Sequence, residues 1–546
     1  MSFHPDSPIK CLLVCPEFPA NSFWNFTTTC EAAGAKSPNI PLGLITVAAI
    51  LPQHWQFRLV DVNCTELHDD DILWSDLVAV GGMLPQQASA LQIIRRIKSL
   101  NRFVVIGGAD VSNQPEVYSE ADARVLGEGE ITIPQWLESW RAGQPQGLFQ
   151  SEERANMQES PIPRYDLVNF GDYLSAAVQI SRGCPFNCEF CDIIVLFGRK
   201  PRTKSPDQVI AELETIKALG YRGGVDVVDD NFIGNKRFIK RELLPALRRW
   251  NRPKLRPFYF LTEASMNLAD DRKLMDEMVM AGFRIVFLGI ETPDPRLLLQ
   301  TQKSQNTMRP VTERIHKILD AGLLVTGGFI MGFDNEPKGM DKPMIACIED
   351  AAVPAAMVGL LVALPKTQLY HRLKKEGRLM GFDGRKLTDH DRIADTSQAI
   401  FDCSDQTTAG LNFMPTRPRG EIVQEYQNVI RYIYRPDIYL ERLRRQISLL
   451  NARPKRLPRW FEIRREIPAL FRIGRYFLSD PATRWPFLRL MSTALIKGPN
   501  NLDLALRFAS LYMHLRKQRD HILDATQSLQ ADIPYDQDQL KVKPSA

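Results

Sequence analysis

The chain has 546 residues, of which 44% are hydrophobic and 24% are charged, and its formal net charge at pH 7 is +5. This length predicts two to four globular domains, and so small a charge gives no argument for a nucleic-acid partner. No apolar run approaches the ~18 residues that a membrane span requires, and the polar start with Pro5 and Pro8 is unlike a signal peptide. Nine scattered cysteines are typical of a reducing compartment, so we expect a cytoplasmic protein.

Residues 10–145 alternate between short apolar runs, rich in Val, Leu and Ile, and stretches with helical spacing, such as residues 43–51 and 85–100. The predicted strands are residues 11–15, 57–62, 77–81, 103–107 and 124–126. The alternation predicts a Rossmann-like α/β domain over residues 1–145, with a ligand beyond the carboxyl ends of a parallel sheet.

Glycines follow three successive strands of this predicted sheet. Glycine lets a loop turn sharply and lets a bulky ligand approach the backbone, although turn glycines alone are common. The candidate ligand-binding residues at these ends are Gly81, Gly82, Gly107, Gly108, Ser112, Gly127, Glu128 and Gly129.

A connecting segment over residues 146–172 precedes a second strand–helix alternation, which we expect to form a barrel domain over residues 173–385. Its strand candidates are residues 176–181, 225–230, 258–262, 285–291, 325–331 and 357–364. Its helix candidates are residues 206–219, 236–250, 271–281, 311–321 and 367–377. Six βα units are fewer than the eight of a closed TIM barrel, so we expect a six-unit partial barrel with reactive groups at the carboxyl ends.

Cys184, Cys188 and Cys191 form a C-x3-C-x2-C array just after the first of these strands. Three thiolates on one tight loop can hold three irons of a 4Fe–4S cluster and leave the fourth iron open. A structural zinc site needs four ligands, and no fourth Cys or His lies close by in the sequence. Three thiols also cannot pair off as disulfides, so the array predicts an iron–sulfur cluster.

Polar side chains end the later strands, and Asp229, Glu263 and Glu291 are the candidates for ligand binding. Acidic and amide side chains also cap helices, which is the role we expect for Asn235. A basic run over residues 197–204 follows the cysteine loop. This run either neutralises a carboxylate or the cluster charge, or it forms a solvated basic loop.

A mostly helical domain is expected over residues 386–546, with helices at 421–433, 440–450, 460–478 and 502–523. Pro468 should kink or split the third helix. Between Arg442 and Arg475 there are eleven Lys or Arg and two acids, with apolar residues interleaved. Such a basic amphipathic segment either lies on an anionic membrane surface or packs on the barrel with a solvated basic face. No nucleic-acid-binding module accompanies the charge.

The cysteine array, with Phe190 in the aromatic position before its third cysteine, resembles the C-x3-C-x-aromatic-C loop of radical S-adenosylmethionine (SAM) enzymes. The runs 106–112 and 125–130 resemble the cobalamin-binding domain found upstream of many radical SAM domains. Residues 361–370 resemble the end of the family's barrel, so the resemblance covers residues 10–385. The D-x-H-x-x-G motif of other cobalamin folds, whose His coordinates cobalt, is absent from the chain.

The resemblance implies three cofactors: a 4Fe–4S cluster on the three cysteines, SAM and cobalamin. It places Phe190 beside the SAM adenine, and Asp229, Glu263 and Glu291 around the rest of SAM. It implies a cobalamin-dependent radical SAM C-methyltransferase acting on an unactivated carbon of a small-molecule or lipid-like substrate. The alternatives are a non-methylating radical oxidoreductase or cyclase, and a cofactor-binding sensor. An electron donor such as flavodoxin or ferredoxin is the expected protein partner, and peripheral membrane contact stays open.

Overall fold

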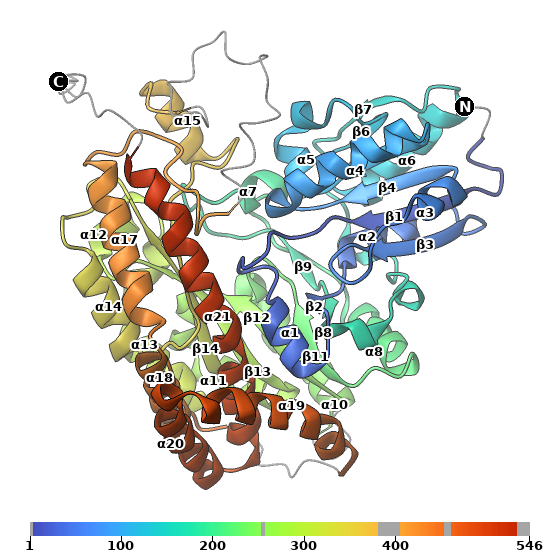
Figure 1. The fold of residues 1–546 in the computed structure, drawn as a ribbon. Helices are drawn as coiled ribbons and strands as arrows, with labels where there is room; N and C mark the ends of the chain where they lie inside the picture. The colour runs from blue at the N-terminus through green and yellow to red at the C-terminus, as the bar shows by residue number, and fades with distance from the viewer. Residues whose placement is uncertain (1–3, 253–256, 381–404, 453–459, 532–546) are drawn as a thin grey trace.

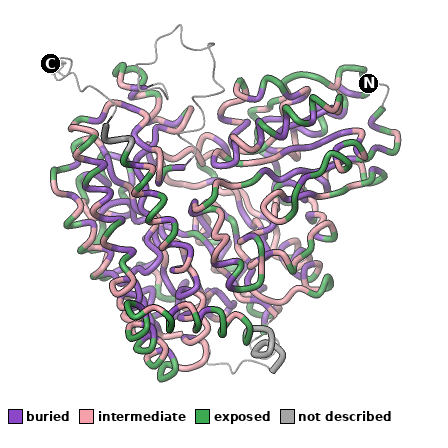
Figure 2. The backbone as a smooth tube through the Cα atoms, in the orientation of Figure 1, coloured by how far each residue is buried: buried purple, intermediate pink, exposed green. Residues whose placement is uncertain are grey.

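The structure is a computed structural model that describes residues 4–252, 257–380, 405–452 and 460–531. Two parallel sheets, each flanked by helices, lie side by side, and a group of C-terminal helices packs along the second sheet (Figure 1). Figure 2 shows buried backbone running through both sheets. The expected domain boundary at residue 385 lies outside the described residues, and the proposed domain limits stay predictions.

The N-terminal sheet has the strand order β3-β1-β4-β5-β6-β7, and all of its pairs are parallel. Its strands are β1 (Lys10–Cys15), β3 (Gln56–Asp61), β4 (Leu77–Gly81), β5 (Phe103–Gly107), β6 (Ala123–Val125) and β7 (Gly147–Phe149). Its helices are α2 (Leu42–Ile50), α3 (Asp69–Trp74), α4 (Gln87–Ser99), α5 (Ala109–Asn113) and α6 (Gly129–Arg141). The expected strands are present within about two residues, which confirms the α/β fold class.

Both faces of this sheet are covered because successive side chains of a strand point to opposite sides. In β1, Leu12 and Val14 pack with α3, α4 and α5, whereas Cys11 and Leu13 pack with α2 and α6. The sheet extends to Phe149, so the segment expected as a linker over residues 146–172 contributes its last strand, β7. A three-residue strand at a sheet edge carries too little pattern to be predicted from sequence.

The second sheet is curved and has the order β15-β14-β13-β12-β11-β8-β2, again with parallel pairs throughout. Its strands are β2 (Ser37–Asn39), β8 (Tyr173–Val178), β11 (Gly223–Val227), β12 (Phe258–Ala264), β13 (Phe283–Glu291), β14 (Leu324–Met331) and β15 (Ala356–Leu360). Six strands come from the expected βα units, and β2 joins the edge from the N-terminal region. The six-unit partial barrel is therefore confirmed, with one added strand.

Helices cover the outer side of this curved sheet (Figure 1). They are α8 (Pro206–Ala218), α9 (Lys236–Phe238), a π-helical turn (Ile239–Leu243), α10 (Leu244–Trp250), α11 (Arg272–Ala281), α12 (Pro295–Gln300), α13 (Val311–Ala321) and α14 (Asp341–Asp350), whereas α15 (Gln368–Lys375) lies beyond the carboxyl end of the sheet. In β12 the buried residues Phe258 and Phe260 face these helices. The alternate residues Leu261 and Glu263 are less buried and point to the inner side of the sheet.

The C-terminal helices close the open side of the partial barrel. They are α17 (Arg419–Ile433), α18 (Pro436–Leu449), α19 (Trp460–Ser479), α20 (Pro481–Lys497) and α21 (Pro499–Ala531). The long helix α21 lies beside α17 and beside α1 (Thr27–Ala33) from the N-terminal region. Pro468 was expected to kink or split α19, but the helix runs through it without a break, and α20 was not predicted. Within the described ranges, every helix is too short or too polar to cross a membrane.

Candidate functional site

The three cysteines lie on a loop between β9 (Ser181–Arg182) and α7 (Ile193–Leu196), directly after the first barrel strand. All three are free thiols; Cys188 is buried, and Cys184 and Cys191 are half-buried. The loop turns tightly, since the Cys191 amide donates to the Cys188 carbonyl at 3.2 Å. Gly183, with φ of +95°, starts the turn where a Cβ would lie 2.9 Å from the Gly198 carbonyl. Backbone geometry thus gathers the thiols at the carboxyl end of the sheet.

Amide side chains from two later loops donate to the cysteine sulfurs. The Asn231 Nδ2 lies 3.7 Å from the Cys184 Sγ, and the Gln305 Nε2 lies 3.7 Å from the Cys188 Sγ. The Gln305 Oε1 is buried without a hydrogen-bond partner. Hydrogen bonds to sulfur stabilise thiolate-bound clusters and tune their potentials.

The donor set fits a 4Fe–4S cluster held at three corners. Across the described residues, no three His, Cys, Asp or Glu side chains converge on the position of a single metal ion. A cube does not require such convergence, because each thiolate binds a different iron. Three free thiols with neighbouring amide donors match that arrangement.

Two aspartates at the end of β11 hold the start of the cysteine loop. Asp229 accepts hydrogen bonds from the Ile180 amide at 2.7 Å and the Ser181 hydroxyl at 2.6 Å. Asp230 accepts from the Gly183 amide at 2.8 Å. Burial raises the pKa of Asp229 to about 6 in spite of these hydrogen bonds. Asp229, expected near SAM, thus has both carboxylate oxygens engaged by the loop that carries the cysteines.

Glu291 and Phe190 lie together beside the cysteine loop. Glu291, at the end of β13 with φ of +70°, forms a buried ion pair with Lys303. The Lys303 Nζ lies 5.7 Å from the centre of the Phe190 ring, which packs edge-on against Phe333 at 6.1 Å. Burial opposes the charge on Lys303, but the Glu291 carboxylate raises its pKa above the ordinary value. A cation and an aromatic face therefore flank the cysteines.

A pocket of about 380 Å³ adjoins Phe190. Phe333, Leu361 and Leu369 form part of its apolar wall, and Arg372 and Arg378 lie on its polar side. Asp334 accepts hydrogen bonds from both arginines, at 2.9 Å from each. Burial alone would raise the pKa of Asp334, but these arginines hold it below its usual value. The pocket offers an aromatic and aliphatic surface beside a fixed set of charges.

Glu263 lies apart from the cysteines, on the inner side of the barrel. Its side chain is accessible to water, although the barrel wall surrounds it. Burial, with contributions from the charges of Asp226 and Asp230, raises its pKa to about 8. Asp226 accepts a hydrogen bond from the Asn39 Nδ2 at 2.9 Å, so the added strand β2 also contributes to this inner surface. Glu263 therefore keeps its proton to a higher pH than a free glutamate does.

At the carboxyl edge of the N-terminal sheet, glycines bring two loops into contact. A Cβ on Gly108, with φ of +119°, would lie 2.6 Å from the Gly82 carbonyl oxygen. The Ser112 hydroxyl donates to the Gly108 carbonyl at 2.8 Å and accepts from the Gly127 amide at 2.9 Å. The backbone of Gly108 and Gly127 is exposed at this edge. Close packing between the loops thus accounts for Gly108, while an open backbone surface remains.

The other predicted glycines lie on the same edge. Gly81 and Gly107 end adjacent, paired strands, and Gly129 begins α6. Among the described residues, no His follows β1, β4, β5 or β6. His68 instead caps the start of α3, and His54 precedes β3 at the opposite end of the strands. The exposed glycine backbone at this edge fits the close approach of a bulky cofactor.

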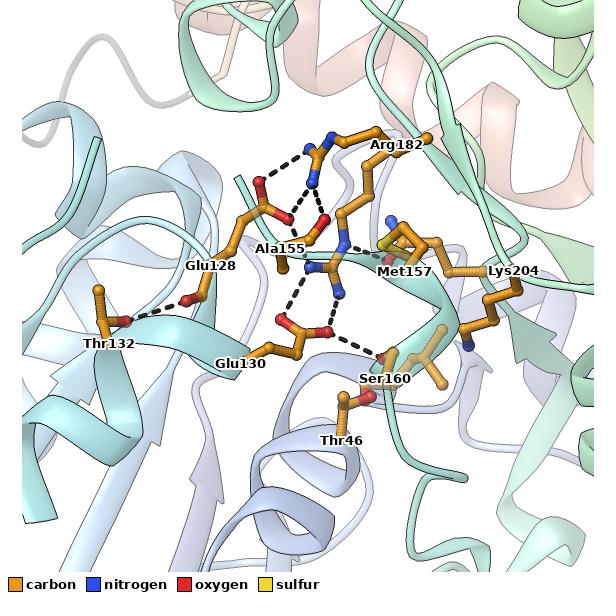
Figure 3. A network of polar contacts seen from close by, with 12 residues as sticks. Thr46, Glu128, Glu130, Thr132, Ala155, Met157, Ser160, Arg182 and Lys204 are labelled. Atoms are coloured by element: carbon orange, nitrogen blue, oxygen red, sulfur yellow. Dashed lines mark hydrogen bonds and ion pairs between the residues drawn. The ribbon is translucent and has the colours of Figure 1, made fainter. Parts of the chain in front are cut away.

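Glu128 does not point to open space, because an ion-pair network joins it to the barrel (Figure 3). Its buried carboxylate pairs with Arg182 at 3.0 Å and with Arg202 at 2.8 Å. Glu130 pairs with Arg182 at 2.9 Å and accepts from the Ser160 hydroxyl at 2.9 Å. We call Glu128, Glu130, Arg182 and Arg202 the clamp. Glu128 was expected to contact cobalamin, and its carboxylate is already engaged by two arginines.

The clamp also shows what the basic run over residues 197–204, after the cysteine loop, contacts. Arg202 neutralises Glu128, and Lys204 forms a buried ion pair with Glu212. The run therefore neutralises carboxylates and is not simply a solvated loop. Asn235 caps α9 by accepting from the Phe238 amide at 3.1 Å, as expected.

Contacts beyond the clamp bring the two carboxyl edges face to face. The Lys366 Nζ donates to the Ser112 carbonyl at 2.6 Å, and the Asn113 Nδ2 donates to Asp192 at 3.2 Å. Sequence reasoning missed Lys303, Gln305 and the clamp arginine Arg182, because no spacing rule links them to the cysteines. The glycine edge and the cysteine loop nonetheless lie next to each other.

Comparisons with known proteins agree with this geometry. The model of the radical SAM superfamily matches residues 178–344, and that of a domain of unknown function (DUF4070) matches residues 367–528. An uncharacterized methyltransferase of Synechocystis sp. is 43% identical over 446 residues, covering 81% of this chain and 80% of its own. The hopanoid C-2 methylase of Rhodopseudomonas palustris is 38% identical over 362 residues, covering 65% and 68%.

A solved structure shares the fold over nearly the whole chain. The cobalamin-dependent SAM radical enzyme OxsB, with aqua-cobalamin bound, has a TM-score of 0.58 at 16% sequence identity. The match covers 97% of this chain and 82% of OxsB. The sequence relatives and the matching family model agree with the residues described above, and the chain belongs to the radical SAM superfamily, with the fold of a cobalamin-dependent SAM radical enzyme.

Proposed function

We propose that this protein is a cobalamin-dependent radical SAM C-methyltransferase that acts on an unactivated carbon of a small-molecule or lipid-like substrate. The observation that carries the proposal is the cysteine loop of the barrel facing the glycine edge of the N-terminal sheet, with the clamp between them. The names of the most similar relatives, a methyltransferase and a methylase, support methyl transfer as the outcome.

The cofactors would supply the chemistry, in that the cluster with SAM generates a radical and cobalamin carries a methyl group. Cys184, Cys188 and Cys191 would hold the cluster, and Asn231 and Gln305 would donate to its sulfurs. The protein's own task is to hold, orient and shield these groups.

Phe190 would lie along the SAM adenine, on the side of the pocket formed with Phe333 and Leu361. The Glu291–Lys303 pair offers a carboxylate and an ammonium group beside the cysteines, suited to the amino and carboxylate groups of SAM. Glu263 would line the inside of the barrel, where its raised pKa favours the protonated form that can donate a hydrogen bond.

The glycine edge would accept cobalamin, since Gly108 and Gly127 expose backbone and no His of the described residues follows β1, β4, β5 or β6. The substrate would lie between the two edges, shielded from water. The clamp keeps the edges at a fixed separation while both cofactors act on the same molecule.

The substrate class rests on a relative whose name specifies a hopanoid, so a polycyclic lipid or pigment is the proposed type. An electron donor such as flavodoxin or ferredoxin would reduce the cluster. We place the protein in the cytoplasm, in peripheral contact with a membrane from which a lipid-like substrate could be drawn.

The proposal is tested with anaerobically reconstituted protein, cobalamin and SAM carrying an isotope-labelled methyl group. We expect S-adenosylhomocysteine and 5′-deoxyadenosine to form together, because one SAM gives its methyl group and another gives the radical. In a separate experiment on the host strain, the labelled methyl group should appear in a metabolite or lipid, and it should be missing from a strain in which the gene is deleted. Formation of 5′-deoxyadenosine without S-adenosylhomocysteine or labelled product would favour a non-methylating radical enzyme. Formation of neither would favour a cofactor sensor.

A further inference from the structure

Helices α19 and α20 expose an apolar surface at the end of the molecule opposite α15 (Figure 1). Phe471 is 74% exposed, Trp485 68%, Leu495 61% and Ile496 87%. The exposed large apolar side chains of these two helices are Ile467, Leu470, Phe471, Leu478, Trp485, Leu488, Leu495 and Ile496. Single exposed apolar side chains are ordinary, but a contiguous set on adjacent helices marks an interaction surface.

The exposed residues follow helical spacing and share one side of each helix. In α19, residues 467, 471 and 478 recur at intervals of four and seven, and in α20, residues 485, 488 and 495 recur at three and seven. The opposite sides pack inward, where Phe477 stacks on Phe487 with ring centres 4.7 Å apart. The exposed side is thus the side that the protein itself does not need for packing.

Cations are interspersed with these apolar side chains. Between residues 467 and 497 there are five, namely Arg472, Arg475, Arg484, Arg489 and Lys497. The same stretch has one acid, Asp480, which accepts from the Ala482 amide and pairs with Arg516 at 3.1 Å. Over residues 467–497 the surface therefore presents positive charge around its apolar residues, although Arg472 also donates to the Ala32 carbonyl at 2.9 Å.

We infer that the α19–α20 surface binds an anionic lipid bilayer, with its apolar side chains in the interface and its cations against the headgroups. A helix with one apolar side and flanking Lys or Arg binds in the plane of a membrane by these two contributions. Trp485 suits this position, because indole rings favour the boundary between headgroups and acyl chains. The inference refines the peripheral location proposed above and does not depend on the reaction catalysed.

A second copy of the chain fits this surface less well. A twofold interface would bring the same patch onto itself, so five cations and one occupied acid would face an identical set. Like charges at an interface are repulsive. An anionic bilayer instead complements the charge and accepts the apolar side chains without requiring a matching pocket.

The test is flotation of the full chain, without cofactors or substrate, with vesicles of 70% phosphatidylcholine and 30% phosphatidylglycerol or of phosphatidylcholine alone. Wild-type protein should float with the anionic vesicles, and less in high salt. The variant Phe471→Ser/Trp485→Ser/Ile496→Ser should lose flotation. Arg475→Gln/Arg489→Gln should weaken binding roughly thirtyfold on anionic vesicles and little on neutral ones.

The matched control removes exposed apolar side chains elsewhere, through Leu73→Ser/Leu219→Ser/Met308→Ser. It should float like wild type, and thermal unfolding of every variant checks that the chain is folded. Wild-type protein that stays with the soluble fraction, or a triple variant that floats like wild type, would overturn the inference. Dimerisation that the triple variant abolishes, with no vesicle binding, would assign the surface to a second copy. Because flotation needs no catalysis, these results are independent of the methyl-transfer proposal.

Discussion

The carboxyl edge of the N-terminal sheet and that of the barrel sheet differ in the kinds of residues that form them. The N-terminal edge works through missing side chains, since Gly108 and Gly127 expose backbone where any Cβ would intrude or strain the chain. The barrel edge works through side chains, with thiols, amides and the Glu291–Lys303 pair crowded around one loop. One edge is shaped for a bulky ligand and the other for charged and metal-bound groups.

The difference extends to how each edge is held in place. Ser112 ties the glycine loops together with two hydrogen bonds, whereas Asp229 and Asp230 tie the cysteine loop to β11. The clamp then joins the two edges through buried charge. Adding a side chain should therefore damage the first edge, and removing one should damage the second.

The largest effect is expected from Cys188→Ala. Losing one of three thiolates should abolish cluster binding, so reconstituted iron should fall from about four per chain to background, and SAM cleavage should stop. The fold should persist, because a small buried side chain is replaced by a smaller one. Iron assay and circular dichroism measure both results.

The matched control is Cys347→Ala, which removes another free thiol, on α14, remote in sequence from the loop. It should keep its iron. If Cys188→Ala protein also retained full iron and cleaved SAM, the role assigned to the barrel edge would be wrong.

Next in size is Glu128→Ala, which breaks the clamp. Removing this fully buried carboxylate leaves Arg202 with hydrogen bonds to backbone carbonyls but without its ion-pair partner, and leaves Glu130 as the acidic partner of Arg182. Breaking a buried charge network in this way costs about 3–5 kcal/mol. The unfolding temperature of Glu128→Ala should therefore be well below that of the wild type. Glu128→Gln should lose less stability, because the glutamine amide keeps some of the hydrogen bonds.

Glu138→Ala, on the exposed side of the same helix α6, is the control and should change stability little. Equal unfolding temperatures for Glu128→Ala and Glu138→Ala would show that the clamp does not join the edges energetically.

The sequence predicted the parts of this comparison that have local patterns. Short apolar runs predicted the strands of both sheets except β2 and β7, and the cysteine spacing predicted the loop. Strand β2, by contrast, is a three-residue Ser-Pro-Asn segment, and it is a strand only because it pairs with β8. A Pro in so short a segment argues against a strand on local grounds.

The clamp could not be predicted for a related reason. Glu128 and Arg182 are 54 residues apart, and their contact exists only after both sheets have formed. The run after β6 was interpreted as cofactor-binding because glycines dominate it, whereas its carboxylates serve the barrel. Lys303 and Gln305 are likewise far from the cysteines in the sequence, and only the folded barrel brings them close.

Gly108→Ala tests the glycine edge by adding a side chain to it. The new Cβ would lie 2.6 Å from the Gly82 carbonyl oxygen, which is backbone and cannot rotate away. Overpacking of this kind costs about 1–3 kcal/mol, and the displaced loops should also bind cobalamin more weakly. Thermal unfolding and absorbance titration with cobalamin measure the two effects.

Gly143→Ala is the matched control, since Gly143 also has a positive φ, of +83°, but no atom lies within 4 Å of its added Cβ. It should keep cobalamin binding. Equal loss in both variants would mean that backbone strain, and not the contact between the two loops, decides the effect.

The smallest effect is expected from Glu263→Gln, which tests the inner side of the barrel edge. Burial, together with the charges of Asp226 and Asp230, raises the pKa of Glu263 from its ordinary 4.5 to about 8 in the folded protein. As pH rises from about 5 to 8, the unfolded chain loses this proton and the folded chain keeps it, so the wild type loses stability over that window. Glutamine binds no proton, so the variant should gain stability relative to wild type across the same window and level off above pH 8. Because water reaches Glu263, we expect a modest rise in unfolding temperature, about 2 °C at pH 8.5 and none near pH 4. Glu138→Gln is the control, and a difference between Glu263→Gln and wild type that stays constant from pH 4 to 9 would contradict the raised pKa.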